Sequence, residues 1–179
     1  MNLIENGKFS KPITNWKIDG TTISKDDVTG YFKVKFNGAG IDNRTFYSGS
    51  ISTIPTGQKY SVYIKAYSLE SSLNIKIGSV DDSQAVTITN NSNIPKTYKV
   101  EGLVRGVSNA LSILGELKNT IGTLFISEIK VEPGSVSTPY VPSASEVTPS
   151  DYPSYTGWYV GKIADGQSLD PTKYNWQRI

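Results

Sequence analysis

The stretch Tyr60–Tyr67, read as YSVYIKAY, changes character at every residue. Tyr60, Val62, Ile64 and Ala66 fall on one side of an extended chain, and the four residues between them fall on the other. This period of two predicts a β-strand with one buried face. The same alternation predicts further strands over 31–36, 45–51, 73–77, 85–89, 97–104, 110–114 and 124–131.

Short turn sequences separate these strands, among them Asn37-Gly38 and Asn90-Asn91. Helix propensity alone would also allow a helix over Ser108–Leu117, but the glycines at 106 and 115 bracket this stretch tightly and favour a strand. Eight or nine strands at roughly ten-residue spacing predict an all-β protein, an antiparallel β-sandwich of the jelly-roll type. A short, aromatic-rich C-terminal extension follows it.

The composition excludes several functions. The chain of 179 residues has 18 basic and 16 acidic side chains, a net charge of +2, and no block of Lys or Arg, so we expect no nucleic-acid partner. It has no histidine and no cysteine, which excludes Ser-His-Asp and Cys-His catalysis and thiolate metal sites. The start MNLIENGKFS lacks the basic and apolar parts of a signal peptide, and no apolar run is long enough for a membrane helix.

The composition changes after Pro133-Gly134, which suggests three parts. Residues 1–134 are predicted to form the jelly roll. Residues 135–154 are rich in Ser, Pro and Thr and are predicted to be a semi-rigid linker. Residues 155–179 are predicted to be a docking tail, because five aromatic side chains in so short a segment need a surface to bury them: Tyr155, Trp158, Tyr159, Tyr174 and Trp176.

Two stretches resemble a known family. The opening Asn2–Phe9, NLIENGKF, followed by Trp16, resembles the start of carbohydrate-binding modules of the galactose-binding, jelly-roll superfamily. The segment 124–142, LFISEIKVEPGSVSTPYVP, resembles the last core strand of such modules in phage tail proteins. The tail is similar to segments of baseplate and fibre proteins from phages of Gram-positive bacteria.

The resemblance implies a non-catalytic module that binds host cell-wall polysaccharide or teichoic acid, assembled with other baseplate and tail proteins in the phage virion. Two alternatives stay open: a structural baseplate adaptor that binds no sugar, and a binding module detached from a wall-degrading glycosidase. The family often holds a structural calcium ion, for which Glu5 and Glu128 are the available carboxylates. Calcium takes six to eight oxygens, so we expect no metal and no cofactor here.

Saccharides stack on aromatic rings while polar side chains bind their hydroxyls. Tyr63, Lys65 and Tyr67 share the polar face of one predicted strand, and we expect Asn74 and Lys76 on the corresponding face of the next. An ordinary exposed sheet face would carry the same residue types. A second candidate is the loop that leads into the strand predicted over 45–51, with Arg44 and Tyr47, although a polar turn would have the same composition.

Two carboxylate pairs, Asp26-Asp27 and Asp81-Asp82, have the composition that glycoside hydrolysis requires. Neighbours in a strand point to opposite faces, however, and both pairs lie in turn-like sequence, so solvated turns are the better interpretation. We therefore expect no enzyme activity.

Overall fold

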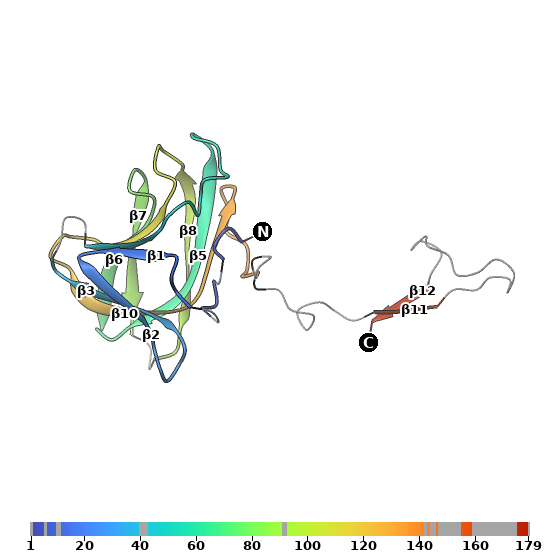
Figure 1. Cartoon of the computed structure of the whole chain (residues 1–179), viewed down its shortest axis with the longest axis horizontal. Coiled ribbons are helices and arrows are strands. Elements are labelled where there is room, and N and C mark those ends of the chain that lie inside the picture. The colour runs from blue at the N-terminus through green and yellow to red at the C-terminus, as the bar shows by residue number, and fades with distance from the viewer. Residues whose placement is uncertain are drawn as a thin grey trace, which may run out of the picture. The chain divides into compact units, whose positions relative to one another are not determined.

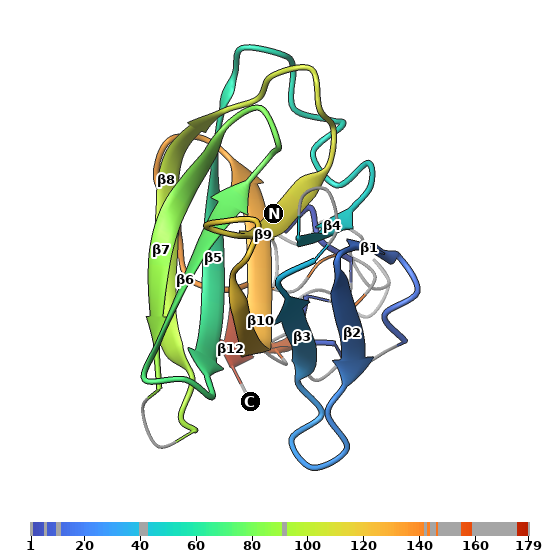
Figure 2. The same cartoon turned by 90° about the vertical axis from the view of Figure 1, so that its left-hand side faces the viewer.

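A computed structural model describes residues 2–5, 7–9, 12–39, 43–90, 93–141, 143, 146, 155–158 and 175–178. The chain divides into two compact units, Met1–Glu146 and Val147–Ile179. The first unit holds two antiparallel five-stranded sheets, which form the two layers in Figure 1 and Figure 2. The predicted fold class, an all-β antiparallel sandwich of jelly-roll type, is therefore confirmed.

Sheet A has the strand order β1-β4-β9-β6-β7, and sheet B has the order β2-β3-β10-β5-β8. The described residues include no helix, and therefore none that could cross a membrane. The strands of sheet A are β1 (Trp16–Asp19), β4 (Arg44–Tyr47), β9 (Leu111–Gly115), β6 (Ser72–Gly78) and β7 (Ser83–Thr89). Those of sheet B are β2 (Thr21–Lys25), β3 (Phe32–Asn37), β10 (Ile121–Pro133), β5 (Lys59–Ser68) and β8 (Lys96–Val104).

The core lies between the sheets and follows the predicted alternation. Tyr60, Val62, Ile64 and Ala66 of β5 are fully buried, as the YSVYIKAY pattern requires. Aromatic rings close one part of the core, where Phe9 stacks on Phe32 at 4.8 Å between ring centroids. The inward side chains of β6 and β9 meet these residues from sheet A: Leu73, Ile75, Ile77, Leu111 and Ile113.

Three local features differ from the predicted strands. The segment 16–25 forms two strands that alternation did not predict, and Gly20, at φ 73°, separates the strand in sheet A from the strand in sheet B. The strand predicted over 45–51 ends at Tyr47, because Ser50 Oγ donates a hydrogen bond to the Tyr47 carbonyl and closes a turn. In β8 the pairing with β5 shifts register next to Gly102, whose φ of 72° suits a bulge.

The described residues 135–141, 143 and 146, called the strap below, belong to the first unit, which ends at Glu146 and not at the position 134 that the sequence suggested. Its chain is bound to the outer face of sheet B. Ser61 Oγ donates to the Val136 carbonyl at 3.0 Å, and Lys99 Nζ donates to the Ser137 carbonyl at 3.0 Å. Pro-, Ser- and Thr-rich composition therefore marks a surface strap here.

The second unit contains β11 (Tyr155–Trp158) and β12 (Asn175–Arg178), which pair antiparallel. Of the predicted docking residues, Tyr155 and Trp158 lie in β11 and Trp176 lies in β12. Tyr159 and Tyr174 are outside the described residues.

Candidate functional site

Tyr63, Lys65 and Tyr67 lie on the outer face of sheet B, as predicted, but the two tyrosines are not exposed. Tyr63 is 9% exposed, because the Tyr140 ring of the strap lies over it at 6.4 Å between centroids. Its hydroxyl donates to Glu128 Oε2 at 3.3 Å. Tyr63 therefore orients a carboxylate, and the expectation that its ring is open to solvent is wrong.

Tyr67 is only 4% exposed and is one ring of an aromatic stack on the same face. It lies 4.9 Å from Phe125 with the two planes 5° apart, and Tyr31 meets it edge-on at 6.5 Å. Burial raises the pKa of the Tyr67 phenol, and the nearby charge of Asp26 adds to the effect. The ring of Tyr67 is therefore a support for Tyr31, and it too is not an open stacking surface.

Beside these buried rings, the outer face of sheet B opens into a cleft of about 330 Å³, called the sheet B cleft below. Its size lies at the low end of the range for small-molecule sites, about 300–1,000 Å³. Tyr31 supplies a half-buried aromatic ring, and Lys65 is the predicted site residue that lines it. The lining residues are Lys8, Thr29, Gly30, Tyr31, Lys65, Ile94, Pro95, Ser127 and Glu128.

A β-bulge in β10 brings two consecutive residues to this cleft. Ile126 pairs with Ala66 and Glu128 pairs with Lys65, so Ser127 is an extra residue between them. Ile126 and Ile129 both point into the core and are fully buried. Because of the bulge, Ser127 and Glu128 both line the cleft, whereas neighbours in a regular strand point to opposite faces.

Four further contacts hold the cleft in place. Ser127 Oγ donates to the Lys65 carbonyl at 3.1 Å, which fastens the bulge to β5. Lys65 Nζ lies 4.0 Å from Glu128 Oε1. Lys8 enters from the N-terminal segment, where its backbone N–H donates to Glu146 Oε1 at 2.8 Å and its ammonium group lies 5.3 Å from the centre of the Tyr140 ring.

Asn74 and Lys76 do not lie beside Tyr63 and Tyr67, and this part of the prediction is wrong. The chain crosses from sheet B to sheet A between β5 and β6, so these two residues lie in the opposite layer. Thr87 Oγ1 of the neighbouring strand donates to Asn74 Oδ1 at 2.9 Å. Consecutive strands of a sandwich often belong to different sheets, and alternation alone does not reveal it.

Arg44 and Tyr47 also lie in sheet A, with different surroundings. The Arg44 guanidinium lies 4.9 Å from the centre of the Phe46 ring and 4.0 Å from Asp19 Oδ2. Tyr47 is 8% exposed and packs edge-on against Trp16 at 5.6 Å, so it is a core residue. Burial raises the pKa of Tyr47, although its hydroxyl accepts a hydrogen bond from Asn15.

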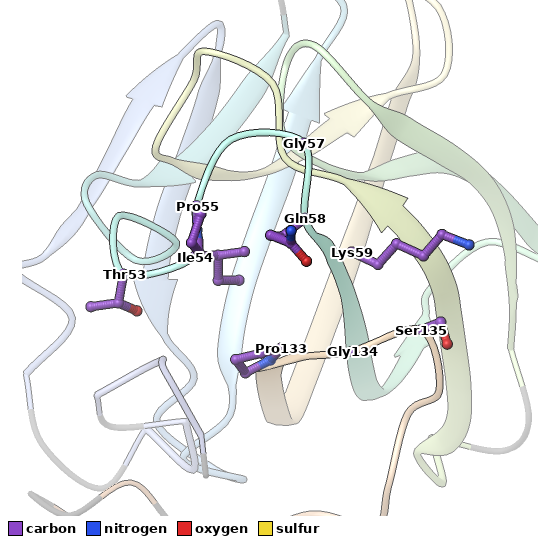
Figure 3. Close-up of a pocket in the computed structure, with 9 residues that line it drawn as sticks. All are labelled: Thr53, Ile54, Pro55, Gly57, Gln58, Lys59, Pro133, Gly134 and Ser135. Carbon is purple, nitrogen blue, oxygen red and sulfur yellow. The ribbon is translucent and has the colours of Figure 1, made fainter.

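A larger cavity of about 560 Å³ lies where the β4–β5 connection meets the end of β10 (Figure 3). In Figure 3 the Gln58 side chain lies beside that of Ile54, and Pro133 is below both in this view. Among the described residues that line this cavity there is no aromatic ring, and Lys59 is the one charged side chain. The sheet B cleft combines a ring with charged groups of both signs and hydroxyls, so it is the better candidate for saccharide chemistry. The residues that line the larger cavity are Thr53, Ile54, Pro55, Gly57, Gln58, Lys59, Pro133, Gly134 and Ser135.

The carboxylates named from the sequence have separate places. Glu5 lines a small recess with Trp16 and Tyr47, whereas Glu128 lines the sheet B cleft. Among the described residues, no three His, Cys, Asp or Glu side chains gather as a metal site would require. Asp26 accepts hydrogen bonds from the Thr29 hydroxyl and backbone, which lower its pKa, and so stabilises a turn.

Asp81 and Asp82 hold the connection between β8 and β9. Asp82 accepts a hydrogen bond from the Val104 backbone, and Asp81 accepts one from the Ser108 backbone. Both carboxylates of the pair therefore serve loop structure, in agreement with the turn interpretation.

Tyr31, Ser127 and Lys8 were not predicted from the sequence as cleft residues, and Glu128 was named only as a calcium ligand. Tyr31 alternates with Lys33 and Lys35, so its face was available from the pattern. The bulge is also visible in the sequence. The apolar residues of β10 lie two residues apart at 124 and 126 and at 129 and 131, but three apart between 126 and 129. For Lys8 there is no such signal, since its position depends on the fold of the N-terminal segment.

The chain thus folds as an antiparallel jelly-roll sandwich, and several solved structures resemble it. No protein-family model and no curated protein matches it. A family 4 carbohydrate-binding module is 21% identical over 73% of this chain and 99% of its own, with a TM-score of 0.46. A family 35 carbohydrate-binding module from Clostridium thermocellum is 14% identical over 66% of this chain and 93% of its own, with a TM-score of 0.48.

A third solved structure is the enzymatically active domain of tailspike protein 4 from bacteriophage CBA120. It is 16% identical over 74% of this chain and 21% of its own, with a TM-score of 0.46. At these identities, the likeness of all three structures concerns the fold.

Proposed function

We propose that the chain is a non-catalytic saccharide-binding module and that the sheet B cleft is its binding site. The observation that carries the proposal is the half-buried ring of Tyr31 in a cleft with ammonium, carboxylate and hydroxyl groups around it. The ring offers an apolar face for the C–H groups of a sugar, and the polar groups fix its orientation through the hydroxyls.

The finer proposal is an accessory adhesion module of a phage tail baseplate that binds host cell-wall polysaccharide or teichoic acid and is carried in the virion. It is supported by the resemblance of the segment 124–142 to the last core strand of such modules in phage tail proteins, and of the tail to segments of baseplate and fibre proteins. The second unit supports it too, because β11 and β12 form a two-stranded sheet, which is marginally stable alone and gains from docking to baseplate or tail proteins. Repetition around a baseplate would raise the avidity of a weak module by about 10²–10⁴.

Co-sedimentation with purified cell walls from Gram-positive hosts tests the saccharide proposal. Tyr31→Ala should lose wall binding, because it removes the ring from the cleft. The matched control is Phe46→Ala, which removes a partly exposed ring from the outer face of sheet A. The proposal is overturned if no wall preparation retains the wild-type protein, and its site is overturned if Phe46→Ala loses binding while Tyr31→Ala keeps it.

One observation favours a second candidate function, the structural adaptor. Tyr63 and Tyr67, which sequence analysis chose as stacking rings, are both buried and serve packing. An adaptor would join a baseplate through its second unit and leave walls unbound. Particle assembly measured beside wall binding separates the two functions, and a chain that assembles into particles without binding any wall is the adaptor.

A module detached from a wall-degrading glycosidase would use the same cleft. Its distinguishing property is a catalytic partner domain in its source protein. We expect no lysis of peptidoglycan by this chain in a zymogram, and a clear band at its mass would overturn the non-catalytic proposal.

A further inference from the structure

The polar groups of the sheet B cleft differ in how far their hydrogen bonds are already made within the protein. The Thr29 hydroxyl donates to Asp26, and the Ser127 hydroxyl donates to the Lys65 carbonyl. Both hydroxyls therefore face a ligand mainly as acceptors of weak strength. The strong donors that line the cleft are the ammonium groups of Lys8 and Lys65, each with three N–H bonds.

The carboxylates around the cleft, in contrast, already have donors from the protein. Glu128 accepts from the Tyr63 hydroxyl and faces Lys65. Glu146 accepts from the backbone N–H of Lys8 and of Ser143 and from the hydroxyl of Tyr140. Because these oxygens already accept hydrogen bonds from protein donors, they have fewer free lone pairs with which to bind a ligand.

The two lysines differ from the carboxylates in this respect. Lys8 is exposed, and its ammonium group lies over the ring of Tyr140, which is not a hydrogen-bond acceptor of full strength. The Lys65 side chain is 40% exposed, and its distance of 4.0 Å from Glu128 is that of a loose ion pair. In the part of the chain that the structure describes, the cleft is thus lined by two cationic donors and by one carboxylate that already has two partners.

We propose that the saccharide bound in the sheet B cleft carries an anionic group, a carboxylate or a phosphate, which Lys8 and Lys65 bind together. The inference rests on the proposed saccharide function and narrows its ligand class. Charge-assisted hydrogen bonds from ammonium groups to such an anion are stronger than bonds to neutral hydroxyls. A neutral sugar would offer these two ammonium groups only uncharged hydroxyl acceptors, which form weaker bonds.

Three probes separate the sources of the charge: poly(glycerol phosphate), an oligogalacturonate, and the methyl ester of the same oligogalacturonate. The ester keeps the sugar chain and removes its charge. Isothermal titration with the full chain should give binding of at least one anionic probe and at least tenfold weaker binding of the ester. Lys8→Gln and Lys65→Gln should each weaken anion binding about tenfold. Lys76→Gln, on the outer face of sheet A, is the control and should have no effect.

Salt supplies an independent readout, because both ammonium groups are accessible to solvent. Raising the ionic strength from about 0.01 to 0.15 M shortens the screening length from about 30 to 8 Å, so the affinity for the anionic probe should fall. Equal affinity for the acid and its ester overturns the anionic inference and leaves the saccharide function standing. Failure of every probe and of every wall preparation overturns both.

Discussion

The buried ion pair under the strap gives the sharpest stability prediction. Lys130 is fully buried, and its ammonium group donates to Glu132 Oε1 at 2.8 Å, to the Pro139 carbonyl at 2.8 Å and to the Thr138 hydroxyl. Two of these three acceptors belong to the strap. Lys130→Met keeps most of the side-chain volume but removes the charge, so Glu132 remains buried without its cation.

Breaking a buried pair by removing one partner costs about 3–5 kcal/mol. For a domain of this size, each kcal/mol shifts the midpoint of thermal unfolding by about 2–4 °C, so Lys130→Met should lower it by roughly 6–20 °C. The double variant Lys130→Met/Glu132→Leu removes both charges, and such replacements are often neutral. Here the backbone N–H and hydroxyl of Thr138 then lose Glu132 as acceptor, at about 1–3 kcal/mol.

Urea unfolding of the full chain, followed by far-ultraviolet circular dichroism, measures these differences. We expect the single variant to be less stable than the double variant. A free energy of unfolding for Lys130→Met within about 1 kcal/mol of wild type would refute the reasoning, because a buried carboxylate without its cation costs more than that. A double variant less stable than the single one would refute it equally, since the remaining charge would then not be the source of the cost.

Three further predictions concern the cleft and its supports. Tyr67→Ala should lower the free energy of unfolding by about 3–5 kcal/mol, because it removes the ring stacked on Phe125. Tyr67→Phe keeps the stack and should cost less than about 1 kcal/mol. Thermal unfolding measures both variants, and equal losses would contradict the role of the stack. Glu128→Gln should raise the affinity for an anionic probe by about threefold in isothermal titration, because Glu128 is the one carboxylate among the described residues that line the cleft. Weaker binding would contradict this and show that Glu128 contacts the ligand. Burial opposes ionisation of Glu146, but hydrogen bonds from Lys8, Ser143 and Gly7 hold its pKa below the ordinary 4.5. The ionised form of Glu146 therefore stabilises the folded state above pH 4.5, and this stabilisation is lost as the pH falls through the lowered pKa. As the pH is lowered from 7 to below 4, the melting temperature of Glu146→Gln should therefore fall less than that of wild type. Parallel plots of melting temperature against pH would contradict this.

The two-layered β fold could be predicted from the sequence, but which strands belong to the same sheet could not. Alternation in YSVYIKAY identified the buried side of β5 correctly, since burial of every second residue follows from the geometry of one strand. Placing Asn74 next to this strand failed, because sheet membership depends on the path of the chain after Ser68, where three residues, 69–71, lead to the other layer. The sequence of β6 looks the same in either sheet.

The candidate site was predicted only in part, because its cover comes from far along the chain. Tyr63 and Lys65 were placed on the right face, but Tyr140, 77 positions after Tyr63, covers one of them. The composition of the strap was typical of a solvated linker. What holds it against the sheet is a set of specific bonds, such as those from Lys99 and Lys130, and no composition rule encodes their geometry.

These contacts explain why the cleft lies at the bulge of β10 and not over the tyrosines. The strap covers Tyr63 through Tyr140, and Phe125 and Tyr31 cover Tyr67, so these two rings of β5 are unavailable to a ligand. At the bulge the backbone turns two polar side chains outward together, and the strap and the N-terminal segment meet there through the bond from Lys8 to Glu146. A ligand at this place would contact Lys8, whose backbone is bonded to the last residue of the first unit. The ligand and the strap therefore stabilise the same arrangement of Lys8, and a change that loosens the strap should weaken binding without touching the ligand.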